Sequence, residues 1–137
     1  MISKGFTLVE LMMVMAILAI LAGVAITQYA SYKNKIKAKD LITLAGACVQ
    51  EILAHCVTDG NFSDPAALEN CRTRNGTMWL DTISFTADPP FSSFSCNRTF
   101  AVTASAKIKG TDITYRATCI YDVSKEDISC SGPKEAP

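Results

Sequence analysis

A run of sixteen residues from Leu11 to Ile26 contains no charged, amide or hydroxyl side chain, and it constrains the fold more than any other feature of this 137-residue chain. As a helix, at about 1.5 Å per residue, the run is about 24 Å long, just short of a bilayer core. Extended to positions 6–30, it reaches about 37 Å and can cross a bilayer with some tilt. The longer segment includes Glu10, and an acidic residue buried in a bilayer costs about 2.5 to 3.5 kcal/mol on insertion scales. An explanation of the segment must therefore account for this carboxylate.

Two conventional interpretations leave Glu10 without a role. A secretory signal peptide would use Lys4 as its basic start and the small residues Gly23-Val24-Ala25 as its cleavage site, and would release a secreted, disulfide-rich binding protein. A plain single-pass anchor is the second interpretation. Neither of them needs an acidic residue at the head of the apolar run.

The six cysteines are an even number in a short chain, which favours disulfides formed in an oxidising compartment. They are Cys48, Cys56, Cys71, Cys96, Cys119 and Cys130. No pair has the C-x2-4-C spacing of zinc ligands, so disulfides are favoured over a metal site, and we expect no metal and no cofactor. Six cysteines allow fifteen pairings, among which the sequence cannot choose.

The charges give two further indications. Thirteen basic residues balance thirteen acidic ones, so the footprint of a general nucleic-acid binder is missing, and nucleic acid is a possible but disfavoured partner. One lysine precedes the apolar run and four follow it, at positions 33, 35, 37 and 39, which by the positive-inside rule would place the C-terminal domain in the cytoplasm. The cysteines indicate the opposite side, and we give them more weight.

Helical periodicity continues beyond the apolar run. Apolar residues recur at 3,4,3,4 spacing at Ile42, Ala45, Val49, Ile52 and Cys56, which predicts one long helix over residues 6–57 with an amphipathic second half. Asp59-Gly60-Asn61 is a typical helix end. On this helix Cys48 and Cys56 cannot pair with each other, because eight residues rise about 12 Å.

From Thr99 onward the period changes to two. Residues 100–109 and 113–121 alternate between apolar and polar side chains around a turn at Gly110-Thr111, which predicts a hairpin with one buried face. If Lys109 pairs with Asp112, Lys107 lies opposite Thr114 and Ser105 opposite Arg116, so the polar side chains share one surface. The basic residues Lys107, Lys109 and Arg116 are then the best candidates for contact with DNA or a surface.

A second hairpin, from Asp122 to Asp127, places Cys119 opposite Cys130 if its turn centres between Ser124 and Lys125. For the other cysteines our working assignment is Cys56 with Cys71 and Cys48 with Cys96. Residues 59–95 are predicted to be a loop-rich connection, and residues 131–137 a flexible tail. The aromatic residues of the connection are expected to be packing anchors of the core: Trp79, Phe85, Phe91 and Phe94.

Motifs of catalysis are missing from the sequence. It contains no phosphate-binding loop, no H-E-x-x-H and no nucleophile elbow. The single histidine, His55, adjoins Cys56, but neighbouring helix positions do not give the opposed geometry of a Cys-His pair. We therefore do not expect an enzyme.

The stretch Gly5-Phe6-Thr7-Leu8-Val9-Glu10, followed by the apolar run, resembles the type IV prepilin signature of pilins, pseudopilins and related filament subunits. The resemblance covers about thirty residues. It implies that a prepilin peptidase cuts after Gly5, on the cytoplasmic side of the membrane, and methylates the new amino terminus of Phe6. The processing residues are thus Gly5 and Phe6, and the apolar helix stays on the mature protein.

The resemblance also implies a role for Glu10. In a filament of stacked helices, its carboxylate would pair with the amine of Phe6 in a neighbouring subunit. In a low dielectric the two charges offset part of each other's desolvation, whereas removal of one partner leaves a buried charge that costs about 3 to 5 kcal/mol. Glu10 would then set the register of assembly.

One departure concerns the middle of the helix. Many pilins have a proline here, in a motif such as I-P-Q-Y, whereas this chain reads Ile26-Thr27-Gln28-Tyr29. Proline would remove a helical hydrogen bond and favour local melting on assembly. Gly23 remains as a weak position of the helix, because glycine lowers helix stability by about 1 kcal/mol relative to alanine.

These observations predict an α+β protein in which a long N-terminal helix packs on a small antiparallel sheet. The expected segments are a leader at 1–5, an apolar helix at 6–30, the amphipathic half of that helix at 31–58 and a disulfide-bonded head at 59–137. The expected function is a structural subunit of a type IV pilus, a homo-oligomer that resides in the inner membrane as a precursor and then on the cell surface. The alternatives are a type II secretion pseudopilin or minor tip pilin, and the secreted binding protein.

Overall fold

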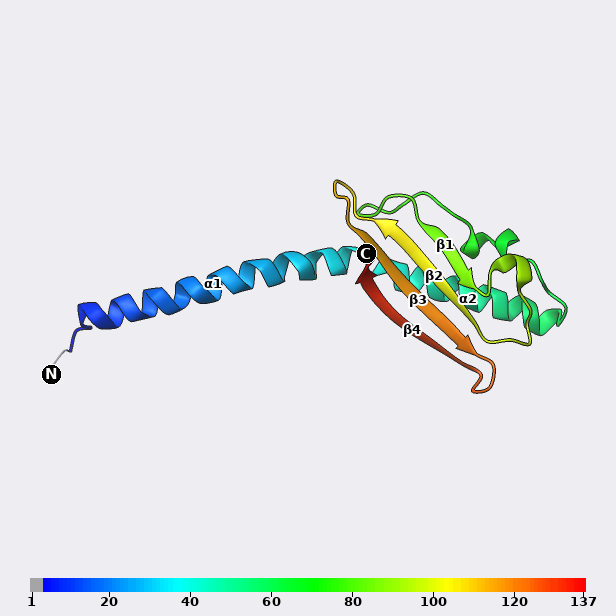
Figure 1. The fold of residues 1–137 in the computed structure, drawn as a ribbon, viewed down its shortest axis with the longest axis horizontal. Coiled ribbons are helices and arrows are strands. Elements are labelled where there is room, and N and C mark those ends of the chain that lie inside the picture. The colour runs from blue at the N-terminus through cyan, green and yellow to red at the C-terminus, as the bar shows by residue number, and fades with distance from the viewer. Residues whose placement is uncertain (1–3) are drawn as a thin grey trace. The chain divides into compact units, whose positions relative to one another are not determined.

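The computed structural model describes residues 4–137 of the chain, so positions 1–3 of the expected leader lie outside the described residues. The chain divides into two compact units, of which the first ends at Asn34 and the second runs from Lys35 to Pro137. The elements are α1 (Leu8–Lys37), α2 (Asp40–Thr58), and the strands β1 (Ser84–Asp88), β2 (Phe100–Lys107), β3 (Thr114–Asp122) and β4 (Asp127–Glu135) (Figure 1). Three short 3-10 helices, η1 (Pro65–Ala67), η2 (Glu69–Cys71) and η3 (Phe91–Ser93), lie in the connection before β2.

The predicted N-terminal helix is confirmed from Leu8 to Thr58, with one interruption at Ala38 and Lys39. There the backbone N–H of Lys39 donates to the carbonyl of Ile36 at 3.1 Å, and that of Leu41 donates to the carbonyl of Ala38 at 3.0 Å. These bonds span three residues in place of four, so the helix tightens locally as in a 3-10 turn.

Helix α1 is apolar on all sides from Leu11 to Ile26, and none of its residues is buried. Its sequence is long and apolar enough to cross a membrane, with a mean hydropathy of 2.6 in its most apolar window. A helix that is hydrophobic all round is normally buried, in a protein core or in a membrane. The described residues of the chain supply no such cover for α1.

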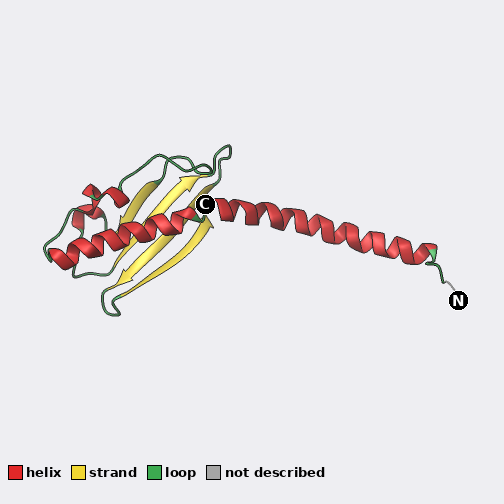
Figure 2. Cartoon of the chain, turned by 180° about the vertical axis from the view of Figure 1, so that it is seen from behind, coloured by secondary structure: helices red, strands yellow, loops and turns green. Residues whose placement is uncertain are grey.

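Helix α2 buries one face against the sheet, as its sequence pattern predicts. The buried positions are Leu41, Ala45, Cys48, Val49 and Ile52, which lie three or four residues apart. The predicted residues Ile42 and Cys56 lie half-buried at the margin of this stripe. Figure 2 shows α2 crossing one face of the sheet, and the helix contacts β2, β3 and β4.

The sheet is antiparallel throughout, in the order β1-β2-β3-β4. The predicted register of β2 and β3 is confirmed, because Lys107 pairs with Thr114 and Ser105 with Arg116. The ladder ends there, and Lys109 does not pair with Asp112. The N–H of Lys109 instead donates to the carbonyl of Trp79 at 2.9 Å, while Asp112 forms a 3.6 Å ion pair with Lys107.

Two parts of the sheet differ from the prediction. Strand β1 lies within the segment that was predicted to be a loop. The sequence did not indicate this strand, because its five residues bury no side chain fully and show little alternation. The expected tail from Ser131 forms the second half of β4, because Glu135 pairs with Tyr115 and the N–H of Ala136 donates to the carbonyl of Thr114 at 2.7 Å. Both segments are edge strands, which pair on one side only and therefore need less apolar sequence.

Two titratable groups of the sheet have shifted pKa values. The Asp122 carboxylate, at the end of β3, accepts hydrogen bonds from the Ser124 hydroxyl at 2.6 Å and the Ser124 N–H at 2.9 Å, and these bonds lower its pKa. Burial, followed by the negative charge of Glu135, raises the pKa of Tyr115. Asp122 thus stabilises the turn in its charged form.

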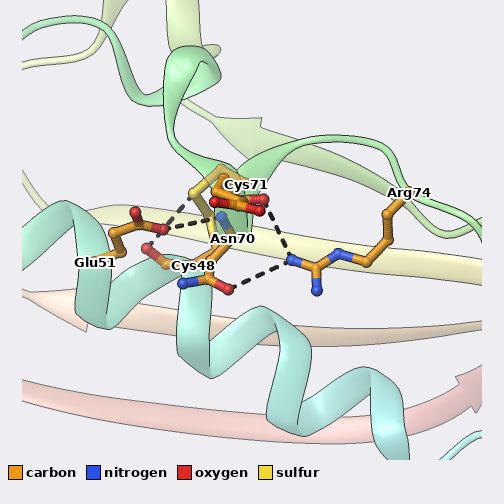
Figure 3. Close-up of a disulfide and its surroundings, with 6 residues drawn as sticks. Cys48, Glu51, Asn70, Cys71 and Arg74 are labelled. Atoms are coloured by element: carbon orange, nitrogen blue, oxygen red, sulfur yellow. Dashed lines mark hydrogen bonds between the residues drawn. A yellow bond between two sulfur atoms is a disulfide. The ribbon is translucent and has the colours of Figure 1, made fainter.

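The disulfides are Cys48–Cys71, Cys56–Cys96 and Cys119–Cys130. The predicted Cys119–Cys130 pair is confirmed, whereas the working assignment of Cys56 with Cys71 and Cys48 with Cys96 is wrong. The reason is that the connection folds back along α2 and places η2 beside the middle of the helix. Figure 3 shows Asn70 there, whose N–H donates to the Glu51 carboxylate at 2.9 Å.

The predicted aromatic anchors behave differently from one another. Phe94 is buried edge-on against Phe100, with ring centroids 5.1 Å apart, while Phe85 and Phe91 pack half-buried on the core. Trp79 does not join the core: it is 47% exposed, and the Lys37 ammonium lies 5.1 Å from the centre of its ring. That distance is within cation–π range, so the indole covers a lysine and not the core.

Candidate assembly site

The candidate assembly site is the start of α1, where Thr7 and Glu10 form a reciprocal capping box. The N–H of Thr7 donates to Oε2 of Glu10 at 2.9 Å, and the N–H of Glu10 donates to Oγ1 of Thr7 at 3.2 Å. A helix start leaves four backbone N–H groups without partners, and the S/T-x-x-E/Q pattern satisfies two donors at once. The T-L-V-E sequence therefore fixes the first turn of α1.

Sequence analysis gave no role to Thr7. The signal that would have found it is the capping-box spacing itself, three residues before an acidic residue at the start of an apolar run. Glu10 consequently has a role inside its own chain, besides any role between chains.

The Glu10 carboxylate keeps capacity for a second partner. Only its Oε2 atom is engaged by Thr7, and an ionised carboxylate has about four lone-pair sites on its two oxygens. In the part of the chain that the structure describes, the one ion pair joins Lys107 and Asp112, so no cation neutralises Glu10. The geometry leaves Oε1 able to accept a hydrogen bond from an ammonium group.

The two predicted processing residues precede the helix. Gly5 and Phe6 lie in a segment without helix or strand, and both are exposed. The Phe6 side chain is 92% exposed and borders a hollow of about 370 Å³ that Glu10, Met13, Val14 and Ile17 complete. This hollow is almost wholly apolar apart from the one carboxylate.

The predicted surface-contact residues do not form one cluster. Lys107 and Arg116 lie on the same polar face of the sheet, with Lys107 paired to Asp112. Lys109 lies in the turn beyond the last β2–β3 pair. Sequence analysis missed Lys134, which β4 places directly opposite Arg116 because the chain continues as a strand where a tail was expected.

Comparison with known proteins supports the interpretation of the N-terminus. The family model of the prokaryotic N-terminal methylation motif matches residues 1–26. The type IV major fimbrial protein FimA of Dichelobacter nodosus (strain VCS1703A) is 37% identical over 92 residues, which are 64% of this chain and 55% of FimA.

Two further relatives are similar over shorter segments. The fimbrial protein EcpC of Eikenella corrodens is 44% identical over 76 residues, or 55% of this chain and 50% of EcpC. The type IV major pilin protein PilE1 of Neisseria gonorrhoeae is 35% identical over 63 residues, or 46% of this chain and 38% of PilE1. The chain thus spans about half the length, or less, of the curated relatives it matches. No solved structure gives a significant match.

The methylation motif lies at the head of an apolar helix that leads into an α+β fold, which is the pilin-like arrangement that the sequence predicted. Among pilin-like proteins, the similarity is to type IV major pilins. The resemblance to type IV pilins is therefore confirmed.

Proposed function

We propose that this chain is a structural subunit of a type IV pilus, which assembles through α1 into a filament on the cell surface. The observation that carries the proposal is the exposure of the apolar part of α1: none of the thirty residues of this helix is buried. Burial of one large aliphatic side chain contributes about 1.5 to 3 kcal/mol, so many such side chains exposed together require cover from another molecule. A membrane and a bundle of identical helices both provide it.

The proposal uses these two environments in succession. In the precursor, α1 would lie in the inner membrane, where a prepilin peptidase would cut between Gly5 and Phe6 and methylate the new amine. The assembly machinery would then transfer α1 from lipid into the filament core. The role of the chain is structural and not catalytic.

In the filament, the free Oε1 atom of Glu10 would accept a hydrogen bond from the Phe6 amine of a neighbouring subunit. The apolar hollow beside Glu10 would keep water from this pair. Because a buried charge without a partner is costly, only the axial offset that brings the two groups together is favourable. The pair would therefore select one axial register among the many that apolar contacts alone would allow.

The proposal is tested by the non-reduced intact mass of the protein in filaments sheared from cells. We expect the dominant species to begin at a methylated Phe6 and to be lighter than the reduced chain by the six hydrogens of three disulfides. A chain found only in membranes, or as a trace in filaments, would indicate a pseudopilin or a minor tip pilin. A soluble product that begins at Ile26 would contradict the proposal and support the secreted binding protein.

The candidate roles of the proposed filament are adhesion, motility or DNA uptake. Removal of the chain from cells, followed by assays of surface attachment, twitching and transformation, separates these roles. A defect in one assay alone would assign the filament to that activity.

A further inference from the structure

The sheet has a polar face that no described helix covers. Helix α2 packs on one face of β2–β4, and Figure 1 shows the strands from the other side, with no helix in front of them. Cross-strand pairing places hydroxyl residues of successive strands side by side on this face. One row contains Thr86, Thr103, Thr118 and Ser131, and the next contains Ser84, Ser105, Arg116 and Lys134.

Two pairs of hydroxyl groups in these rows are within hydrogen-bond distance. Ser84 Oγ lies 2.9 Å from Ser105 Oγ, and Thr103 Oγ1 lies 2.9 Å from Thr118 Oγ1. Each hydroxyl has one donor and two acceptor sites, so a bonded pair retains one donor and three acceptor sites for a ligand. The two bonded hydroxyl pairs are consequently richer in acceptor sites than in donor sites, and they favour a partner that itself carries O–H groups.

The same face has a positive end. Arg116 is exposed and borders a hollow of about 390 Å³ lined by Thr86, Thr103, Ser105 and Thr118. Lys134 lies opposite Arg116, and neither takes part in an ion pair within residues 4–137. A guanidinium group next to hydroxyls can bind a carboxylate through two parallel hydrogen bonds.

We propose that this face, defined by its two hydroxyl rows with Arg116 and Lys134, binds an acidic polysaccharide. The sugar hydroxyls would donate to the acceptor-rich hydroxyl pairs, while the carboxylates would lie at Arg116 and Lys134. Charge complementarity and the donor–acceptor balance select this partner together. The inference goes beyond assembly and does not depend on it, because the face belongs to the second unit alone.

A nucleic acid fits the face less well. The backbone of duplex DNA offers acceptors and no O–H donor, so it would leave the acceptor sites of the hydroxyl rows unmatched. The paired positions of the face carry no aromatic side chain on which a single-stranded base could stack. Asp88 and Asp122, at the far end of the ladder, would in addition repel a continuous line of phosphates.

The test measures binding of the full chain, in non-ionic detergent micelles, to immobilised polygalacturonate at physiological salt. Dextran serves as a neutral polysaccharide and duplex DNA as the other polyanion. We expect binding to polygalacturonate, none to dextran and weaker binding to DNA. No binding to polygalacturonate, or DNA binding as tight as polygalacturonate binding, overturns the proposal.

Three double variants locate the site. Arg116→Gln with Lys134→Gln should weaken binding by about tenfold or more, because charge-assisted hydrogen bonds are lost. Thr103→Val with Thr118→Val changes no charge and should weaken binding by about threefold. Arg98→Gln with Lys125→Gln removes two exposed cations from loops outside the face and should leave affinity within about twofold.

Equal losses in the Arg98/Lys125 control and the Arg116/Lys134 variant would show attraction to net charge alone and overturn the proposed site, as would unchanged binding in the Thr103/Thr118 variant. The yield of sheared filaments from the same variants is read separately, and we expect it to be unchanged. A failure of assembly is thereby distinguished from a failure of polysaccharide binding.

Discussion

Glu10 has two partners to satisfy, and they make different demands on its side chain. Thr7 requires only an acceptor oxygen, which the capping-box geometry supplies within the chain. The amine of a neighbouring subunit would require a negative charge. Because glutamine retains an acceptor oxygen and loses the charge, these two roles can be separated by substitution.

We expect Glu10→Gln to keep the start of α1 and to abolish most filament assembly, since a neighbour's amine would then be buried without a counter-charge. Thr7→Ala should destabilise the start of α1 by about 1 kcal/mol and leave filament assembly intact, because the charge of Glu10 is retained. Hydrogen exchange at residues 8–11 in micelles reports the cap, and the yield of sheared filaments reports assembly. Normal filaments from the Glu10→Gln variant would contradict the charge requirement.

Gly76 is required by the close approach of two chain segments. A Cβ atom at this position would overlap the backbone oxygens of Leu80 and Asp81, which cannot rotate away. We therefore expect Gly76→Ala to lower the free energy of unfolding by about 1 to 3 kcal/mol, the usual range for overpacking. Gly60→Ala is the matched control, because a Cβ there meets no atom within 4 Å. Chemical denaturation of both variants checks the difference.

At the scale of elements, the strength of the local pattern decided what the sequence could predict. The register of β2 against β3 was predictable, since the residues of β2 alternate between apolar and polar and a glycine turn follows, but the predicted Lys109–Asp112 pair at the turn does not form. Strand β1 was not predictable, because Phe85 and Ala87 are only half-buried and its existence depends on β2 as a partner. The disulfide partners of Cys48 and Cys56 could not be predicted either, because they depend on how the loop from Asp59 folds back along α2.

The three disulfides should differ in their contribution to stability. They close loops with sequence separations of 11, 23 and 40 residues. In the chain-entropy model, Cys56–Cys96 then contributes about 4 kcal/mol and Cys119–Cys130 about 3 kcal/mol. Replacement of both cysteines of each pair by alanine, followed by urea denaturation, shows how much each disulfide contributes to the free energy of unfolding. A Cys119–Cys130 variant less stable than the Cys56–Cys96 variant would show that local packing and not loop entropy dominates.

At the scale of the whole molecule, the apolar helix of the first unit needs cover from another molecule, whereas the second unit has a hydrophobic core of its own. Among residues 4–137, every buried residue of the hydrophobic core lies at Ala38 or later in the chain. The second unit therefore holds this core, and α1 contributes only its last turn to that unit. The sequence predicted an apolar helix at 6–30 and an amphipathic helix at 31–58, but it did not predict where the two units divide. Which residues of the head meet each other depended on long-range pairing that no local pattern specifies.

We expect a chain that begins at Lys35 to be soluble, monomeric and oxidised at all three disulfides, since it retains every core residue. Its free energy of unfolding should equal, within about 1 kcal/mol, that of the head in the full chain in micelles. Size-exclusion chromatography and denaturation curves provide the comparison. Aggregation of the truncated chain would show that α1 also protects the head.

The arrangement of the disulfides has a mechanical consequence for a subunit held in a filament under tension. A pulling force that enters through α1 reaches Cys48 and Cys56 on α2, and the bond from Cys56 to Cys96 carries it past the whole intervening loop. Cys119–Cys130 similarly bypasses the β3–β4 turn. The shortest covalent path through the head is therefore much shorter than the chain itself. A stretched subunit would reach the limit of its extension early, and residues 57–95 and 120–129 would bear no covalent load.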